Sequence, residues 1–171
     1  MRKLLGSALL LAAVALIPAG SPAQRRPAAR PAPAPARRTQ FGPELDWSSD
    51  AHFGIGARAV FGLQALIPKA PLDGIVSFDY FFPGSGVHYW EINGNVAYRF
   101  RVPRSSLGPY AGGGLNIAHA SGIGGSATRA GLNLLGGTTF RIKGSHLTPF
   151  AEGRGEIGGG KTFVLTGGVR F

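Results

Sequence analysis

The sequence has 171 residues, which suits one ordinary domain, and it contains 28 glycines, 13 prolines and no cysteine. The absence of cysteine excludes disulfide scaffolds, thiolate metal sites and a lipid anchor on cysteine. The net charge is +10, but residues 1–39 hold seven Lys/Arg and no acid, whereas residues 40–171 hold eleven bases and eight acids. The basic character therefore belongs mostly to the N-terminal segment.

The first 23 residues have the pattern of a secretory signal peptide. Arg2 and Lys3 precede an apolar run at 4–17, and small residues follow as far as Ala23. The alternative is a retained anchor, but an apolar helix of this length spans about 21 Å, short of a hydrocarbon core of about 30 Å. We predict a leader at residues 1–23 that is cleaved after Ala23.

Residues 24–39 carry five arginines separated by proline and alanine. Such a segment has nothing apolar to bury and favours extended conformations over a fold. We predict a disordered, solvated spacer. Its arginines could alternatively contact anionic phospholipid or cell-wall carboxylates, whereas export removes the chain from nucleic acid, which we exclude as a partner.

Residues 40–171 alternate between apolar and polar side chains with a period of two, which indicates strands. The clearest segment is 89–100, where Trp90 and Ile92 share one face and Glu91 and Asn93 the other. Turn residues separate the segments, for example at 68–73 and 120–128. Eight strands are predicted, at 41–47, 52–67, 75–82, 89–100, 109–119, 131–142, 149–157 and 162–171.

The placement of charge indicates which face of these strands points inward. Lysines occur in turns or at a strand end, so no strand offers water a row of lysines. Arginine suits a confined polar interior, because its planar group can bind carboxylates at two points. We therefore predict an ion-paired lumen and a lipid-facing apolar exterior. The lumen network would comprise Glu44, Asp46, Arg58, Asp79, Glu91, Arg99, Arg141, Glu152, Arg154, Glu156 and Arg170.

These features together predict an all-β fold, a closed antiparallel up-and-down transmembrane β-barrel of eight strands. Strands of about 9 to 11 tilted residues cross a bilayer, and closure satisfies every backbone polar group where water is absent. The aromatic residues Trp47, Trp90, Tyr80 and Tyr98 are available for belts at the membrane interface.

The segments 77–83, 109–114 and 149–152, together with the alternating final strand 163–171, resemble the small eight-stranded barrels of the OmpA-like and opacity-type porin family. This resemblance implies that residues 40–171 form a barrel in the bacterial outer membrane, in contact with outer-membrane lipid. It also implies that Phe171, with Val169, forms the signal read by the barrel-assembly machinery during biogenesis.

Three histidines, His52, His88 and His119, are expected at one rim of this barrel. They could form a metal site, a pH-sensitive gate or, with Ser85, Ser121 and Asp50, a hydrolase acting on outer-leaflet lipid. Strand parity points His88 and His119 outward and His52 inward, with no outward carboxylate nearby. We interpret the three as polar rim residues and predict no catalytic, cofactor-binding or metal-binding residues.

The leading functional prediction is a non-enzymatic outer-membrane barrel of structural or interaction type. An eight-stranded barrel is just wide enough to be filled by its side chains, so the charged network would plug it. The alternative is a narrow channel for ions or small polar solutes, because inward glycines such as Gly54 and Gly112 leave room for water. A lipid-modifying enzyme is a remote third possibility.

Overall fold

The structure is a computed structural model and describes residues 38–84, 86–158 and 161–171. The predicted leader and nearly all of the predicted tail lie outside these residues. Within them, no helix combines the length and the apolar character that spanning a bilayer would take. The strands are β1 (Gln40–Ser48), β2 (His52–Gly62), β3 (Leu72–Phe81), β4 (His88–Arg99), β5 (Leu107–Gly122), β6 (Gly125–Phe140), β7 (Thr148–Ile157) and β8 (Lys161–Arg170).

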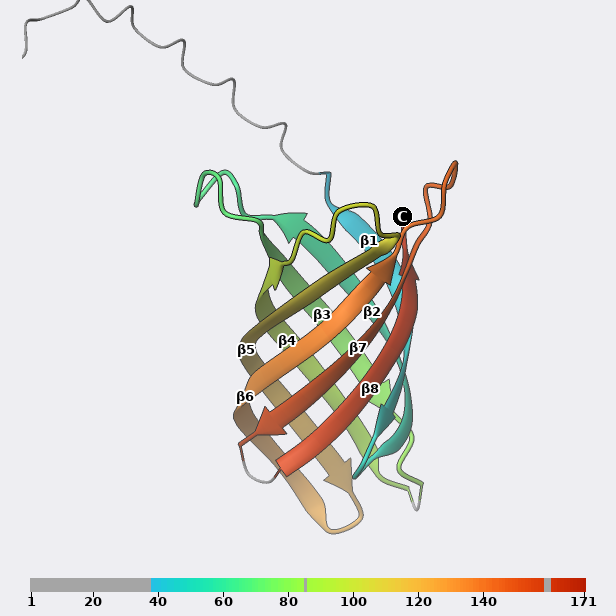
Figure 1. Cartoon of the computed structure of the whole chain (residues 1–171). Helices are drawn as coiled ribbons and strands as arrows, with labels where there is room; N and C mark the ends of the chain where they lie inside the picture. The colour runs from blue at the N-terminus through green and yellow to red at the C-terminus, as the bar shows by residue number, and fades with distance from the viewer. Residues whose placement is uncertain (1–37, 85, 159–160) are drawn as a thin grey trace, which may run out of the picture. The chain divides into compact units, whose positions relative to one another are not determined.

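The eight strands form a closed barrel in which each strand is antiparallel to both neighbours (Figure 1). At the seam, β1 pairs with β8, with Glu44 opposite Gly168. Beyond this ladder, the Phe41 amide donates to the Phe171 carbonyl at 3.1 Å, and the Phe171 amide donates to the Phe41 carbonyl at 2.9 Å. Closure leaves no free sheet edge. The predicted fold class is confirmed.

Strand β4 shows how the sequence sets the two faces of the wall. Glu91 and Asn93 point inward and are fully buried, whereas Ile92, Val96 and Tyr98 point outward and are each 46% exposed. Successive side chains of a strand point to opposite faces, so a period of two in the sequence becomes an inside and an outside. Polar residues inside and apolar residues outside are the arrangement of a membrane barrel, the reverse of a soluble one.

The barrel has two ends, which we call the terminal end and the hairpin end. At the terminal end, β1 begins, β8 ends, and segments 63–71, 100–106 and 141–147 join the strands (Figure 1). At the hairpin end, β5 continues to Gly122 and β6 begins at Gly125. The turn predicted at 120–128 was therefore too long. The small, polar residues of this segment are typical of a turn. They nevertheless pair as strands, for example His119 with Thr128, because backbone pairing does not require an apolar face.

The inward side chains of β3 change character along the lumen in the order Asp73, Ile75, Ser77, Asp79 and Phe81, all of them buried. Polar residues thus lie between two apolar layers. The terminal layer comprises Val60, Ile75, Ala97, Tyr110 and Leu135, and the hairpin layer comprises Ala51, Phe81 and Val164, with Tyr89 packed against it.

Candidate functional site

The lumen between the two apolar layers contains two buried arginines, of which Arg58 on β2 is the first. Its Nε donates to the Glu44 carboxylate on β1, and its two terminal nitrogens donate to the two oxygens of Glu152 on β7 at 3.1 and 3.2 Å. Tyr110 donates its hydroxyl to Glu152 at 2.8 Å, and the Phe150 ring lies 4.1 Å from the guanidinium carbon. Arg58 thus links β2 to β1 and, through a two-point contact, to β7, which is separated from β2 by β1 and β8 in the closed sheet. This two-point geometry is the one for which arginine is suited.

Arg154 on β7 is the second arginine of the lumen and is 1% exposed. Its Nε donates to Glu156 at 2.7 Å. One terminal nitrogen donates to Asp79 at 3.1 Å and to Glu91 at 3.2 Å. Because Asp79 and Glu91 belong to β3 and β4, Arg154 bridges the lumen from wall to wall.

Neutral polar side chains extend this network, and they were not among the predicted lumen residues. Asn133 donates to Asn93 at 2.8 Å and to Asn95 at 3.0 Å, and Asn93 donates to Asp79 at 2.9 Å. Their signal was available, because Asn93 and Asn95 share the strand face of Glu91. The hydroxyl donors are Ser77 to Asp79, Tyr89 to Glu91, Tyr110 to Glu152 and Thr166 to Asp46.

Arg99 was predicted to belong to the lumen network, but the structure pairs it with Asp73 instead. Its Nε lies 2.7 Å from Asp73, and its side chain is 29% exposed. Asp73 was expected in a turn, but β3 begins at Leu72 and places Asp73 inward opposite Ala97. The Arg99–Asp73 pair therefore lies on the terminal side of the terminal layer, apart from Asp79 and Glu91.

Arg141 was also predicted to belong to the lumen network, and the structure places it elsewhere. Strand β6 ends at Phe140, so Arg141 is exposed just beyond it and lines a cavity of about 720 Å³ at the terminal end, which we call the mouth cavity. Arg170 lines the same cavity; it is buried, with its guanidinium carbon 5.6 Å from the Phe150 ring centre. Asp73 is the single acid among the described residues that line the mouth cavity. Six arginines line it: Arg38, Arg99, Arg101, Arg104, Arg141 and Arg170.

The three histidines lie at the hairpin end, where each meets different surroundings. His88 Nδ1 is 2.6 Å from the Tyr80 hydroxyl, and His119 Nδ1 is 2.8 Å from the Thr128 hydroxyl. The His119 ring also stacks on Trp90 at 5.2 Å. His52 is exposed at the start of β2. Ser85 lies outside the described residues, so its place in the hydrolase alternative stays a prediction.

Phe171, the predicted assembly signal, follows β8 and is 62% exposed. Its backbone extends the seam through the two hydrogen bonds to Phe41. Val169 lies two residues earlier, half-buried, opposite Pro149 of β7. The seam thus ends on an aromatic side chain at the surface.

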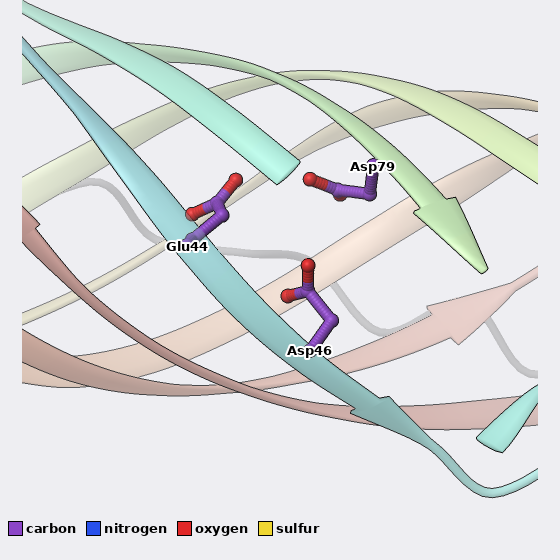
Figure 2. A group of neighbouring side chains, drawn as sticks. All are labelled: Glu44, Asp46 and Asp79. Atoms are coloured by element: carbon purple, nitrogen blue, oxygen red, sulfur yellow. The ribbon is translucent and has the colours of Figure 1, made fainter. Parts of the chain in front are cut away.

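Among the described residues, one group brings three potential metal-ligand atoms together, and it is acidic rather than histidine-based. Glu44 and Asp46 on β1 and Asp79 on β3 each offer an oxygen, and these oxygens all lie within 4.8 Å of one another. Figure 2 shows the three carboxyl groups converging on one region of the lumen. Carboxylate oxygens suit hard cations such as Ca²⁺ and Mg²⁺.

No protein-family model matches the sequence, and no curated protein matches it. Among solved structures, the chain is similar to the N-terminal β-barrel domain of OprF from Pseudomonas aeruginosa, with a TM-score of 0.63 and 17% identity over 80% of this chain and 98% of that one. It is also similar to Neisserial surface protein A, NspA, with a TM-score of 0.58 and 20% identity over 77% of this chain and 94% of that one. The fold is that of the small eight-stranded outer-membrane barrels.

This likeness agrees with the resemblance noted in the sequence. At such identities it concerns the path of the chain rather than individual side chains. The chemistry of the lumen rests on this chain's own residues: Arg58 and Arg154, each bound to carboxylates on more than one strand, with an apolar cluster toward each end of the barrel.

Proposed function

We propose that the protein is an integral barrel of the bacterial outer membrane, of structural or interaction type, with a lumen closed by its side chains. The observation that carries this proposal is the pairing of a buried charged interior with an exposed apolar wall. Large apolar residues at 46–72% exposure surround the middle of the barrel: Leu45, Ile55, Val76, Phe78, Ile92, Val96, Leu115, Ile117, Leu132, Leu134 and Leu165.

Aromatic side chains gather at both ends of this apolar wall, where a bilayer has its interfaces. Several of them contact one another on the outer surface, including Tyr80 with Phe82 at 5.1 Å and Tyr98 with Phe100 at 5.2 Å. The hairpin-end belt comprises Trp47, Phe53, Tyr80, Phe82, Trp90 and Phe163, and the terminal-end belt comprises Phe41, Tyr98, Phe100, Phe140 and Phe171.

Two features support a closed lumen over the alternative of a narrow channel. The arginines bind carboxylates across the lumen, through contacts such as Arg58–Glu152 and Arg154–Glu91. The terminal and hairpin layers then cover this network on both sides with apolar side chains. An ion would have to cross two apolar layers and an ion-paired network, whose charged groups are costly to separate.

The partners we propose are outer-membrane lipid around the wall, and the barrel-assembly machinery acting on Phe171 and Val169 during biogenesis. The basic residues 24–39 and the exposed arginines of the mouth cavity add a third kind of partner. Anionic lipid headgroups or cell-wall carboxylates have the complementary charge. No catalytic step is proposed.

Membrane insertion is tested by refolding residues 24–171 into lipid vesicles and comparing gel mobility with and without boiling. A folded membrane barrel should resist the detergent and migrate differently from the boiled sample. A water-soluble monomer with a charged interior would contradict the assignment of the two faces.

Export is tested separately, in cells. The membrane fraction should contain a chain that begins at Gln24, because the leader pattern ends in small residues at Ala23. Mass spectrometry that finds residues 1–17 still attached to the folded barrel would contradict export by a cleaved leader.

A further inference from the structure

Glu44, Asp46 and Asp79 meet in the lumen although they come from two strands that are not neighbours (Figure 2). Strand β2 runs between β1 and β3, and its residue at this level is Gly56, which lies opposite Glu44 on one side and Asp79 on the other. A Cβ at position 56 would collide with Asp79 Oδ1 and approach Glu44 Cγ to 2.9 Å. Glycine thus keeps open the space into which these carboxylates point.

Each of the three carboxylates uses one oxygen for a hydrogen bond and leaves the other without one. Glu44 Oε2 accepts from Arg58, Asp46 Oδ1 accepts from Thr166 at 2.6 Å, and Asp79 Oδ2 accepts from Arg154 and other donors. The remaining oxygens, Glu44 Oε1, Asp46 Oδ2 and Asp79 Oδ1, are buried and have no hydrogen-bond partner. Buried polar atoms are rarely left in this state, because an unmet acceptor costs free energy.

The surrounding network cannot neutralise these groups. Between the two apolar layers, the described residues include two guanidinium groups, Arg58 and Arg154, against six carboxylates. Buried like charges repel strongly at low dielectric, so an excess of carboxylates is relieved by bound positive charge, either protons or a cation. The six carboxylates are Glu44, Asp46, Asp79, Glu91, Glu152 and Glu156.

We propose that the unpaired oxygens of Glu44, Asp46 and Asp79 bind one hard divalent cation, of the Ca²⁺ or Mg²⁺ class. Carboxylate oxygens are the preferred ligands of both ions, and bound water completes the coordination shell. One such ion supplies the hydrogen-bond-free oxygens with a partner and removes half of the excess negative charge. Because apolar layers close the compartment on both sides, the ion is captured as the barrel folds and exchanges slowly afterwards.

The test begins with the wild-type barrel, refolded into vesicles with Ca²⁺, with Mg²⁺ or with EDTA and then separated from free ions. Metal analysis by mass spectrometry should find one equivalent of Ca²⁺ or Mg²⁺ per barrel, and the EDTA sample should unfold at a lower urea concentration. Retention of no metal, together with equal unfolding midpoints, would overturn the proposal. A metal-free barrel that is instead stabilised by lower pH would also overturn the proposal, because a shared proton would then join these oxygens.

Asp46→Asn is the matched variant, because Asp46 bonds Thr166 rather than an arginine. The amide oxygen can still accept from Thr166, while the amide nitrogen points into the cluster as a donor. We expect this variant to fold, to lose the metal and to become insensitive to EDTA. Glu156→Gln, a lumen carboxylate outside the cluster, is the control and should retain the metal.

The gel-mobility assay separates this proposal from the membrane assignment. Folded, heat-modifiable barrels without bound metal would overturn the cation site and leave the membrane barrel intact. Metal retained by Asp46→Asn at the wild-type level would also overturn the site, since the ion would then be held elsewhere.

Discussion

The guanidinium of Arg154 lies 3.1 Å from the carboxylate of Asp79, and the two residues stand on opposite walls of the barrel. Strand β7 is separated from β3 by three strands in either direction around the closed sheet. A single ion pair therefore spans the lumen, and both side chains are almost completely buried. The pair links the two walls directly through the interior of the barrel.

Replacing Arg154 with Met should strongly destabilise the barrel. The change leaves Asp79, Glu91 and Glu156 without the guanidinium group of Arg154, and breaking a buried ion pair in this way costs about 3–5 kcal/mol. Arg99→Met is the control, because the Arg99 side chain that pairs with Asp73 is partly exposed. Its expected loss of unfolding free energy is smaller and closer to that of exposed ion pairs, about 0–1 kcal/mol. Urea unfolding in vesicles measures both. Equal losses would show that the central network has no special role.

Placing a positive charge on the outer wall should destabilise the barrel about as much as removing Arg154 from the lumen. Ile92 lies near the middle of β4 and faces outward, so Ile92→Arg should cost about 2–4 kcal/mol, as for arginine at the bilayer midplane. Tyr98→Leu, on the same face nearer the interface, should be mild. Unfolding in vesicles is the measurement. If Ile92→Arg were tolerated without loss, this face would not contact lipid.

Deletion of Phe171 should slow assembly more than it lowers the free energy of unfolding. The deletion removes an exposed aromatic side chain and the two backbone hydrogen bonds to Phe41. Phe171→Tyr keeps both and is the control. Insertion rates in vesicles that contain the assembly machinery should fall for the deletion alone, and an unchanged rate would remove Phe171 from the assembly signal.

Phe81→Ala should weaken the hairpin layer. Phe81 is fully buried, and its ring centre lies 5.5 Å from that of Tyr89. Truncation of a buried phenylalanine costs about 3–5 kcal/mol. Phe53→Ala, on the exposed outer face, should lose less by the same unfolding measurement. A similar loss from both would mean that the hairpin layer is not packed as a core.

The sequence was sufficient to predict the faces of the strands, because a period of two assigns each side chain to one of two sides. It was not sufficient to pair the charges. Arg154 and Asp79 are 75 residues apart, and only closure and register bring them together. Arg99 was placed in the lumen network on strand parity alone, which does not give the height of a residue along the lumen.

The neutral part of the network was missed for a related reason. Asn93, Asn95 and Asn133 carry no charge, so a count of ion pairs passes over them, although their hydrogen bonds join β4 to β6. The cluster of Glu44, Asp46 and Asp79 depends likewise on Gly56, whose importance appears only when β2 is placed between β1 and β3.

The central claim, a membrane barrel closed by its own side chains, is tested most directly by electrical recording from a planar bilayer. The wild-type barrel, with insertion verified by gel mobility, should show no steady conductance, because two apolar layers and a cross-lumen ion-pair network block the path. Steady, reproducible conductance steps from the inserted wild-type protein would contradict the account and establish the narrow channel instead.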